Sequence, residues 1–320
     1  PDGKKLRSSC YGTDKSKDIA DCEKFCNEND IPYRVIDLKD EYQKQVIDYF
    51  KAEYRAGRTP NPCIACNRYV KWESLLEKSL AIGADYIATG HYARIERLPN
   101  GRYAVCSSVT AAKDQTYALY GLTQFQLAHT LMPVGSYHKD EIRQLAQRAG
   151  LPVASKPDSQ EICFVPDGDY AAFIDREAGA RVPGQGRFVT GDGQDLGPHR
   201  GITHYTIGQR KHLHLSMGHP VFVTDIRPET NEVVIGEDAD VYSDTLRCTG
   251  INYMAVESLE GPGEVLGKIR YSHRGAPCRI ERTGEDEITA YFHEKVRAVT
   301  PGQAAVFYEN GHVLCGGTIL

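Results

Sequence analysis

The sequence predicts an α/β protein with a parallel sheet in its N-terminal half, followed by a small central domain and a C-terminal β-barrel. Residues 1–165 alternate helical and strand patterns, which is typical of a parallel α/β sheet. Glycine and proline become frequent in residues 166–235, and residues 236–320 consist of short strands between turns. A chain of 320 residues is long enough for several units with cores of their own.

Apolar spacing defines the N-terminal elements. Ile19, Cys22 and Cys26 share one face of a predicted helix, and Asn100-Gly101 supplies the turn of a predicted hairpin. In chain order, we expect a helix over 16–29, a strand over 31–38, a helix ending near Gly57, a helix from Asn67, a strand over 85–90, a hairpin over 93–106, and a helix over 139–149.

The later segments are shorter. DYAAFIDREAG predicts one helix, and RFVT-GDGQ-DLG and HPVFVTDI-RPETN-EVVIG predict hairpins. GEVLGKIRYS, APCRIERTGEDEITAYF and QAAVFYENGHVLCG are short strands bounded by turn residues. Together they predict a small barrel.

Composition limits the classes of function. The net charge of −5 argues against a uniformly basic nucleic-acid surface, so any RNA contact must come from local patches. The sequence shows neither a membrane-spanning stretch nor a signal pattern, which predicts a cytoplasmic location. In that compartment the ten cysteines are expected to be reduced thiols.

The loop RTPNPCIACN carries the first candidate for chemistry. Cys66 directly precedes Asn67, at the predicted start of a helix, where unpaired N–H groups and the helix dipole favour a thiolate. The alternative is that Cys63 and Cys66 are half of a zinc site or small buried residues. A redox pair is a further alternative, although the proline-fixed loop does not follow the first strand of a thioredoxin-like unit.

Two further segments bear candidate site residues. Cys163 lies in KPDSQEICFVP, where a lone cysteine is more often a core residue. ATGHYAR places Gly90 and His91 after a buried strand, at the end of a parallel sheet where ligands bind. A histidine after a strand is nevertheless more often structural than catalytic.

Polar and basic clusters suggest RNA contact. AAKDQTYALY places Lys113, Asp114 and Gln115 at the start of a predicted helix, where such clusters are usually solvated. HYTIGQRKHLHL and KIRYSHRGAPCRI mix Arg or Lys with Tyr or His, which suits phosphate contact and base stacking. A basic strand edge that resists aggregation is the alternative.

The ordered motifs GRTPNPCIACN, GADYIATGHYAR, KDQTYALY, DSQEICF, YTIGQRKHL and KIRYSH resemble those of the bacterial tRNA-specific 2-thiouridylases. The resemblance spans essentially the whole chain. It implies an ATP pyrophosphatase-type domain of the adenine nucleotide α-hydrolase-like class, a small central domain and a C-terminal barrel. The implied activity is ATP-dependent 2-thiolation of the wobble uridine of tRNAs for Lys, Glu and Gln, with Mg²⁺.

The resemblance also implies residue roles. Cys163 matches the cysteine that receives sulfur as a persulfide from a cysteine desulfurase or relay protein, and Cys66 matches the partner that attacks it. The other matched positions surround the target base (Asn61, Pro62, Cys63), touch ATP (Gly90), contact tRNA (Lys113, Asp114, Gln115, Arg270, Tyr271) or help RNA recognition (His91, Gln303).

The sequence departs from the family pattern at two points. The SGGVDS-like loop that cradles pyrophosphate is absent, and we expect that some tens of residues, including a first strand, precede this chain in the intact protein. A tRNA-binding protein without catalysis is the rival interpretation. Cys63 stands where many members carry Asp, so Cys63, Cys66 and Cys163 form a possible ligand set for a [4Fe–4S] cluster, an alternative to the persulfide route.

Overall fold

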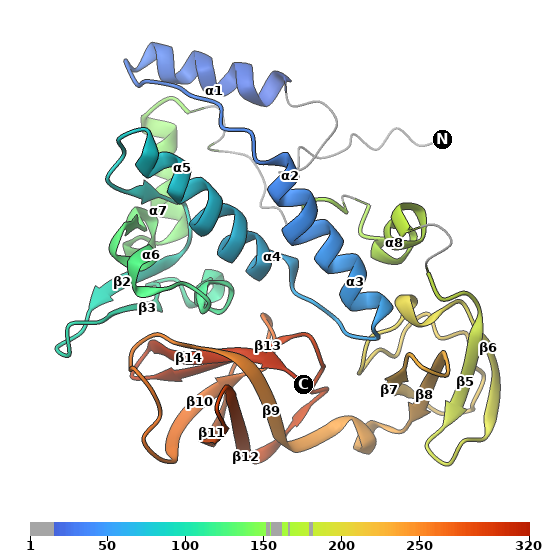
Figure 1. Cartoon of the computed structure of the whole chain (residues 1–320). Coiled ribbons are helices and arrows are strands. Elements are labelled where there is room, and N and C mark those ends of the chain that lie inside the picture. Colours follow the sequence, from blue (N-terminus) through green and yellow to red (C-terminus); the bar gives the residue numbers. More distant parts are fainter. Residues whose placement is uncertain (1–15, 152–153, 155–161, 166, 179–181) are drawn as a thin grey trace.

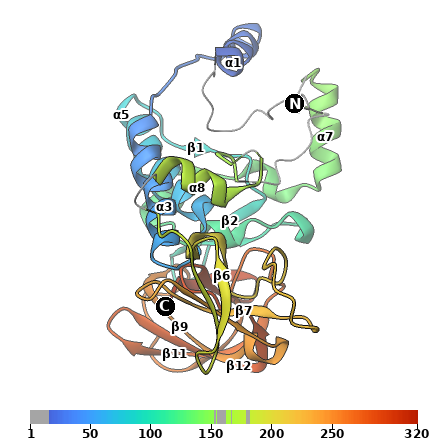
Figure 2. The same ribbon diagram turned by 90° about the vertical axis from the view of Figure 1, so that its right-hand side faces the viewer.

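The computed structural model describes residues 16–151, 154, 162–165, 167–178 and 182–320. A helical N-terminal unit lies above a C-terminal barrel, with a small sheet beside both (Figure 1). The view turned by 90° places α1 (Ser16–Glu28) at one end of the molecule and the barrel at the other (Figure 2). The predicted domain limits near residues 165 and 235 stay predictions.

The N-terminal unit is built around two long helical segments. The first joins α2 (Lys39–Tyr42), a π-helical stretch (Gln43–Asp48) and α3 (Tyr49–Arg55), and the second joins α4 (Pro62–Ala65), a π-helical stretch (Cys66–Leu75) and α5 (Leu76–Ala81). Wide π-type turns are uncommon and occur often at functional sites. Shorter helices follow at α6 (Gln124–Ala128) and α7 (Lys139–Arg148).

At the start of this unit the helix predicted over 16–29 is confirmed as α1, and the strand predicted over 31–38 is wrong. Residues 31–38 form no strand, and Ile31 and Val35 are 47% and 61% exposed. A strand needs a neighbour for its backbone groups, and no described strand lies beside this segment. No residue of α1 is buried, and Cys22 is exposed.

The parallel sheet is small among the described residues. β1 (Ile87–Ala88) pairs in parallel with β4 (Thr130–Leu131), which confirms a strand in DYIATG but shortens it. The predicted hairpin is confirmed as β2 (Ala93–Arg97) and β3 (Tyr103–Ser107). β3 pairs with β14 through His312 and Cys106, so this hairpin extends the barrel sheet.

The central unit contains α8 (Tyr170–Ala178) and a four-stranded sheet of order β6-β5-β8-β7. Both predicted hairpins are confirmed. Their strands are β5 (Gly186–Thr190), β6 (Asp195–His199), β7 (Phe222–Arg227) and β8 (Glu232–Gly236). An unpredicted parallel pairing of β5 with β8 joins the two hairpins into one sheet.

The predicted barrel is confirmed. The strand order β13-β10-β11-β12-β9-β14 closes through the pairing of β13 with β14. Alternating buried and exposed positions along the strands place one face inside, which is the reason these residues form a closed sheet. The strands are β9 (Tyr242–Tyr253), β10 (Gly263–Lys268), β11 (Ala276–Gly284), β12 (Glu287–Arg297), β13 (Ala304–Glu309) and β14 (His312–Ile319).

Single-turn 3-10 helices occupy several connections. They lie at Ala111–Lys113, Thr116–Leu119, Pro133–Ser136, Ile202–His204 and Asp238–Val241. In the part of the chain that the structure describes, no helix has both the length and the apolar character needed to span a membrane. One core cluster runs from Trp72 and Leu76 of the helical unit into the barrel interior, so these two units share buried surface.

Candidate tRNA-thiolation site

The helix that carries Cys63 and Cys66 begins earlier than predicted. Asn61 is its N-cap, because the Asn61 side chain accepts hydrogen bonds from the backbone N–H groups of Cys63 (3.1 Å) and Ile64 (3.4 Å), and Pro62 occupies the first turn. The predicted start at Asn67 is wrong. Asn67 is buried within the helix, where its Nδ2 donates to the Ala118 carbonyl at 2.9 Å.

This shift changes which thiol lies at the positive end of the helix. Cys63 is exposed in the first turn, whereas the N–H of Cys66 already donates to the carbonyl of Pro62. The positive end of the helix dipole therefore lies at Cys63, and not at Cys66 as predicted. Any activation of the Cys66 thiol as a nucleophile must therefore come from the side chains around it.

The loop before this helix is held by the other two units. Thr59 donates its N–H to the carbonyl of Pro301 at 2.9 Å, and its hydroxyl donates to the hydroxyl of Thr206 in the central unit at 3.2 Å. Gln303 donates its side-chain amide to the carbonyl of Thr59 at 2.8 Å. Gly302 approaches the loop so closely that a Cβ would come within 3.0 Å of the Arg58 side chain. Barrel and central unit together fix where Asn61 begins the helix.

Cys66 and Cys163, far apart in the sequence, pack against the same hydrophobic cluster. The cluster includes Tyr42, Phe50 and Phe164, and both cysteines are partly buried at its edge. The hydroxyl of Tyr42 lies 3.0 Å from the sulfur of Cys163, within hydrogen-bonding distance. The structure thus brings the two predicted catalytic cysteines into one region.

Cys63 lies within electrostatic range of another predicted residue, Tyr271. Tyr271 is half-exposed at the barrel surface, and its ring packs edge-on against Tyr117 with the ring centroids 6.2 Å apart. It interacts electrostatically with Asp114, Lys113 and Cys63. Burial, followed by the carboxylate of Asp114, raises the pKa of Tyr271. The helix start, the 3-10 segment and the barrel therefore each place a residue within electrostatic range of Tyr271.

Asp114 and Gln115 use their side chains within the protein. Asp114 accepts hydrogen bonds from the N–H groups of Ser108 (3.1 Å) and Thr116 (3.2 Å). Gln115 accepts from the N–H of Tyr92 at 2.8 Å. These bonds shape two short 3-10 helices in place of the single helix predicted here. The predicted tRNA contacts of both residues remain predictions.

Gly90 and His91 follow β1, but they lie in unlike environments. Gly90 is exposed, and an added Cβ would meet no atom within 4 Å. The centroids of the His91 and Trp72 rings are 5.3 Å apart, and His91 Nδ1 lies 2.9 Å from the hydroxyl of Thr89. Burial, with a smaller contribution from Lys71, lowers the pKa of His91 to about 4, so its ring is neutral at pH 7. The geometry favours the structural alternative for His91.

Arg270 and Gln303 also act inside the protein. The guanidinium of Arg270 donates to the carbonyl of Ala298 at 2.6 Å and to the hydroxyl of Thr300 at 3.1 Å, and burial lowers its pKa. Arg270 thus holds the turn that precedes Gln303, which in turn holds Thr59. Both side chains position the loop, and their direct contact with RNA stays a prediction.

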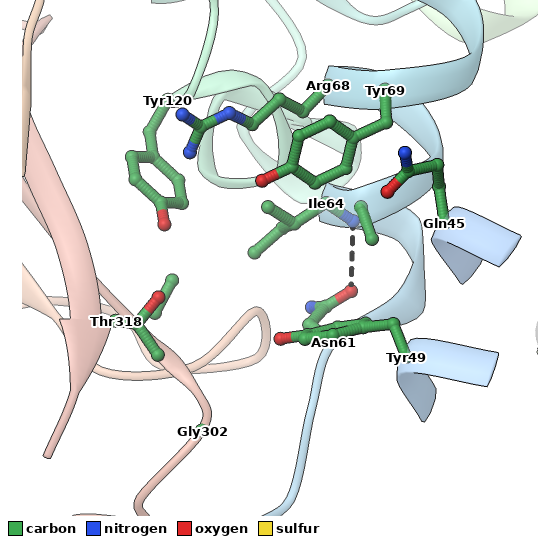
Figure 3. A pocket seen from close by; sticks show the side chains of 11 residues that line it. Gln45, Tyr49, Asn61, Ile64, Arg68, Tyr69, Tyr120, Gly302 and Thr318 are labelled. Atoms are coloured by element: carbon green, nitrogen blue, oxygen red, sulfur yellow. Dashed lines mark hydrogen bonds between the residues drawn. The ribbon is translucent and has the colours of Figure 1, made fainter. Parts of the chain in front are cut away.

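A cavity that was not predicted from the sequence lies between the helix that carries Cys66 and the barrel. Arg68, Tyr69 and Tyr120 point into the same space, with Thr318 on the barrel side (Figure 3). The guanidinium of Arg68 lies 5.2 Å from the centroid of the Tyr69 ring. The remaining lining residues are Gln45, Tyr49, Asn61, Ile64, Ala65, Gly302 and Ala304. The run Asn67-Arg68-Tyr69 mixes cationic and aromatic residues, which was a usable signal.

The possible iron–sulfur ligands show no preformed single-ion site. Among the described residues, one group of three ligand side chains has its donor atoms within 4.8 Å of one another, and it does not include Cys63, Cys66 or Cys163. Cys63 is exposed while the other two pack at the edge of an apolar cluster. Because the ligands of a four-iron cluster lie farther apart than those of a single ion, the cluster route stays a prediction.

Three family models match the three units, and together they define the class of the protein as a tRNA-modifying enzyme. Residues 3–167 match the tRNA methyl transferase HUP domain family, residues 171–237 match its PRC-barrel domain, and residues 243–319 match the aminomethyltransferase beta-barrel domain. These matches confirm the predicted fold class.

Similar proteins give the more specific assignment. The chain is 59% identical over 302 residues to the tRNA-specific 2-thiouridylase MnmA of Lachnoclostridium phytofermentans, covering 94% of this chain and 84% of that protein. It is 50% identical to the protein of that name from Clostridium perfringens (94% and 83%) and 47% identical to that of Clostridioides difficile (94% and 83%). The chain belongs to the tRNA-specific 2-thiouridylase family, as the resemblance predicted.

Proposed function

We propose that this protein is a tRNA sulfurtransferase that makes 2-thiouridine at the wobble position of tRNAs for Lys, Glu and Gln, with ATP as co-substrate. The observation that carries the proposal is the packing of Cys66 and Cys163 against one cluster, beside a loop that all three units hold in place. Relatives named as 2-thiouridylases at 47–59% identity favour the enzyme over a binding-only protein.

The proposed sulfur transfer uses the two cysteines in sequence. A donor protein, a cysteine desulfurase or a relay protein, loads Cys163 as a persulfide. The thiolate of Cys66 attacks the Cys163 sulfur, which forms a disulfide and releases hydrosulfide. Hydrosulfide then replaces the activated oxygen at C2 of the uridine, and a dithiol reductant restores both thiols. The hydroxyl of Tyr42, 3.0 Å from the Cys163 sulfur, orients that sulfur during the exchange.

ATP with Mg²⁺ activates the C2 oxygen by converting it into the leaving group AMP. Gly90 suits contact with the nucleotide, because its exposed face is open and it follows a strand of the parallel pair. Lys71 lies near His91 and donates to the Asn67 side chain at 3.0 Å, so a positive charge lies close to this strand end. Gly90 and the chain beside it would contact one side of the bound nucleotide.

The surfaces proposed for tRNA lie on either side of the helix start. Cys63, Lys113 and Tyr271 form one side, where a cation and an exposed ring suit phosphate contact and base stacking. Arg68 and Tyr69 line the cavity on the other side. Asn61 and Pro62 lie between these surfaces, which is where we place the target uridine.

A sulfide bypass tests the roles of the cysteines. With ATP, Mg²⁺, tRNA and a persulfide-loaded donor protein, Cys163→Ser should abolish formation of 2-thiouridine, measured by mass spectrometry of digested tRNA. Added inorganic sulfide should restore thiolation in Cys163→Ser, because it replaces the hydrosulfide that the cysteine pair releases. Cys248→Ser, a change at a buried barrel position, is the matched control and should keep donor-driven activity.

Two outcomes would contradict the proposal. Donor-driven thiolation by Cys163→Ser at the wild-type rate would remove the proposed sulfur carrier. Failure of the intact protein, with the expected preceding residues present, to modify tRNA with either sulfur source would favour the binding-only interpretation. A brown, iron-containing protein after anaerobic purification would favour the cluster route instead.

A further inference from the structure

Three ligand-type side chains lie together where the β2–β3 hairpin meets the barrel. Cys106 of β3 pairs with Arg94 of β2 on one side and with His312 of β14 on the other. Glu96 lies two residues beyond Arg94, on the same face of β2. The register of three neighbouring strands therefore directs Glu96, Cys106 and His312 to one spot.

The donor atoms of these side chains already lie close together. A carboxylate oxygen of Glu96, the sulfur of Cys106 and a ring nitrogen of His312 lie within 4.8 Å of one another, and His312 Nε2 is 2.8 Å from Glu96 Oε2. Ligand atoms around a tetrahedral zinc ion are separated by roughly 3–4 Å, as bond lengths of about 2.0–2.3 Å require. Small side-chain rotations would complete this geometry.

The surroundings orient the carboxylate for such a role. Arg94 Nη1 lies 2.9 Å from Glu96 Oε1, which leaves Oε2 directed at His312, and Arg94 Nε donates to the carbonyl of Ser107 at 3.0 Å. A second residue that holds a carboxylate ligand in place is a regular feature of metal sites. Cys106 is 2% exposed and His312 is half-buried, so part of the site is shielded from water.

We propose that Glu96, Cys106 and His312 bind a zinc ion that fastens the hairpin to the barrel. One thiolate, one imidazole and one carboxylate form a mixed donor set that favours Zn²⁺ over Mg²⁺ or Ca²⁺, and a water molecule fills the fourth position. Binding releases the thiol proton of Cys106 to solvent, and the thiolate and carboxylate then balance the charge of the ion. No electron transfer is involved.

The position of the site indicates a structural role. The ladder between β3 and β14 consists of the single pair His312 and Cys106, supported by the N–H of Ser107 donating to the carbonyl of Gly311 at 3.1 Å. A ligand from each of the three strands would tie this short junction together. The proposal stands apart from the thiolation chemistry, which uses other cysteines.

The barrel contains a second histidine–carboxylate pair, which serves as a control for the role of the Cys106 thiol in metal binding. His293 and Glu264 also form a pair at 2.8 Å, with their side chains exposed on the outer face. The nearby Cys278 is fully buried on the inner face, because its register partner is the buried Val265 and not Glu264. A histidine–carboxylate pair of the same length therefore lacks a thiol on its own face.

The experiment uses Co²⁺ as a spectroscopic replacement for zinc in the purified, metal-stripped protein under a non-thiol reductant. The wild-type protein should bind one equivalent of Co²⁺ and show a sulfur-to-cobalt charge-transfer band that added Zn²⁺ removes. Cys106→Ser and His312→Gln should lose the band. Cys278→Ser and His293→Gln should keep it, as should Cys63→Ser.

Hydrogen exchange supplies a second readout that does not depend on colour. Saturating Zn²⁺ should slow amide exchange in β2 and β3 by at least about 10-fold in the wild-type protein, and should leave exchange in His312→Gln unchanged. Absence of a charge-transfer band in the wild-type protein would overturn the proposal. A band that persists in Cys106→Ser and disappears in Cys63→Ser would do so too, because it would assign the metal to the thiolation loop.

Discussion

The cysteines of the barrel and those of the loop region occupy opposite environments. Cys248, Cys278 and Cys315 are fully buried among barrel side chains, and desolvation raises the pKa of Cys248 and of Cys278 to about 12. Cys63 is exposed, and Cys66 and Cys163 lie at the edge of a second cluster. Residue type alone does not make a nucleophile, since burial keeps the barrel thiols protonated.

Alkylation should show the largest difference between the two regions. A pKa of about 12 leaves roughly 1000-fold less thiolate at pH 7 than an ordinary thiol has. Iodoacetamide should therefore label the exposed Cys63 long before the buried Cys248 or Cys278, read by peptide mass spectrometry of the folded protein. Cys22, which is exposed on α1, gives the rate for an ordinary surface thiol. Equal labelling rates of the loop and barrel cysteines would show that the two regions do not differ in thiol reactivity.

The barrel was also the region that the sequence predicted better. β10, β11 and β12 pair in chain order, as do β13 and β14, and alternation along β11 and β12 marks the inner face directly. Residues 31–38 have equally strong strand composition but no described partner strand. Strand propensity describes a surface that fits a sheet, and it cannot supply the neighbour.

The candidate site was predicted as a set of residues, but the sequence did not reveal what their side chains contact. The helix start was predicted at Asn67, but Asn67 bonds to the Ala118 carbonyl from within the helix, and Asn61 is the N-cap. Arg270 and Gln303 look like RNA-contacting residues in sequence, yet both bond to backbone carbonyls. Arg68 and Tyr120 meet in one cavity only after folding, so no local pattern joins them.

The pH dependence of the free energy of unfolding should distinguish the packed His91 from the exposed His293 of the barrel. Folding lowers the pKa of His91 to about 4 from an ordinary value of 6.5, so the unfolded chain binds more protons between these values. The stabilisation is complete above pH 6.5 and is lost as the pH falls towards 4, by at most about 3 kcal/mol.

Urea unfolding at several pH values measures this loss. His91→Gln should flatten the decline in the free energy of unfolding between pH 6.5 and 4. The exposed His293 of the barrel supplies the control, and His293→Gln should leave the decline as it is in the wild-type protein. A decline of the same size in His91→Gln would show that other groups cause it.

Removing the N-cap of the helix that carries Cys63 and Cys66 should have a smaller effect on stability. Asn61→Ala removes the acceptor for the N–H groups of Cys63 and Ile64, and should lower the free energy of unfolding by about 1 kcal/mol. Thr123→Ala removes the corresponding cap of α6 and should cost a similar amount. Thiolation measured at matched folded fraction should fall in Asn61→Ala and stay unchanged in Thr123→Ala. Equal activity in both variants would make Asn61 a cap with no role at the target base.

The smallest expected effect concerns the hydroxyl of Tyr42. Tyr42→Phe keeps the ring, which packs edge-on against Phe164 at 6.3 Å, and removes the hydrogen bond to the Cys163 sulfur. Losing one such bond corresponds to about 1 kcal/mol, or roughly a 5-fold slower donor-driven thiolation.

Two comparisons separate positioning from stability in Tyr42→Phe. Sulfide-driven thiolation should be unchanged, because it does not pass through Cys163. Tyr308→Phe breaks a buried hydroxyl contact of 3.1 Å with Thr116 at the barrel and should affect unfolding but not sulfur transfer. If Tyr42→Phe slows both sulfur sources equally, the hydroxyl supports the fold of the site and does not orient the sulfur. If it slows only the donor-driven reaction, the hydroxyl acts on Cys163 itself, from which it lies 3.0 Å away.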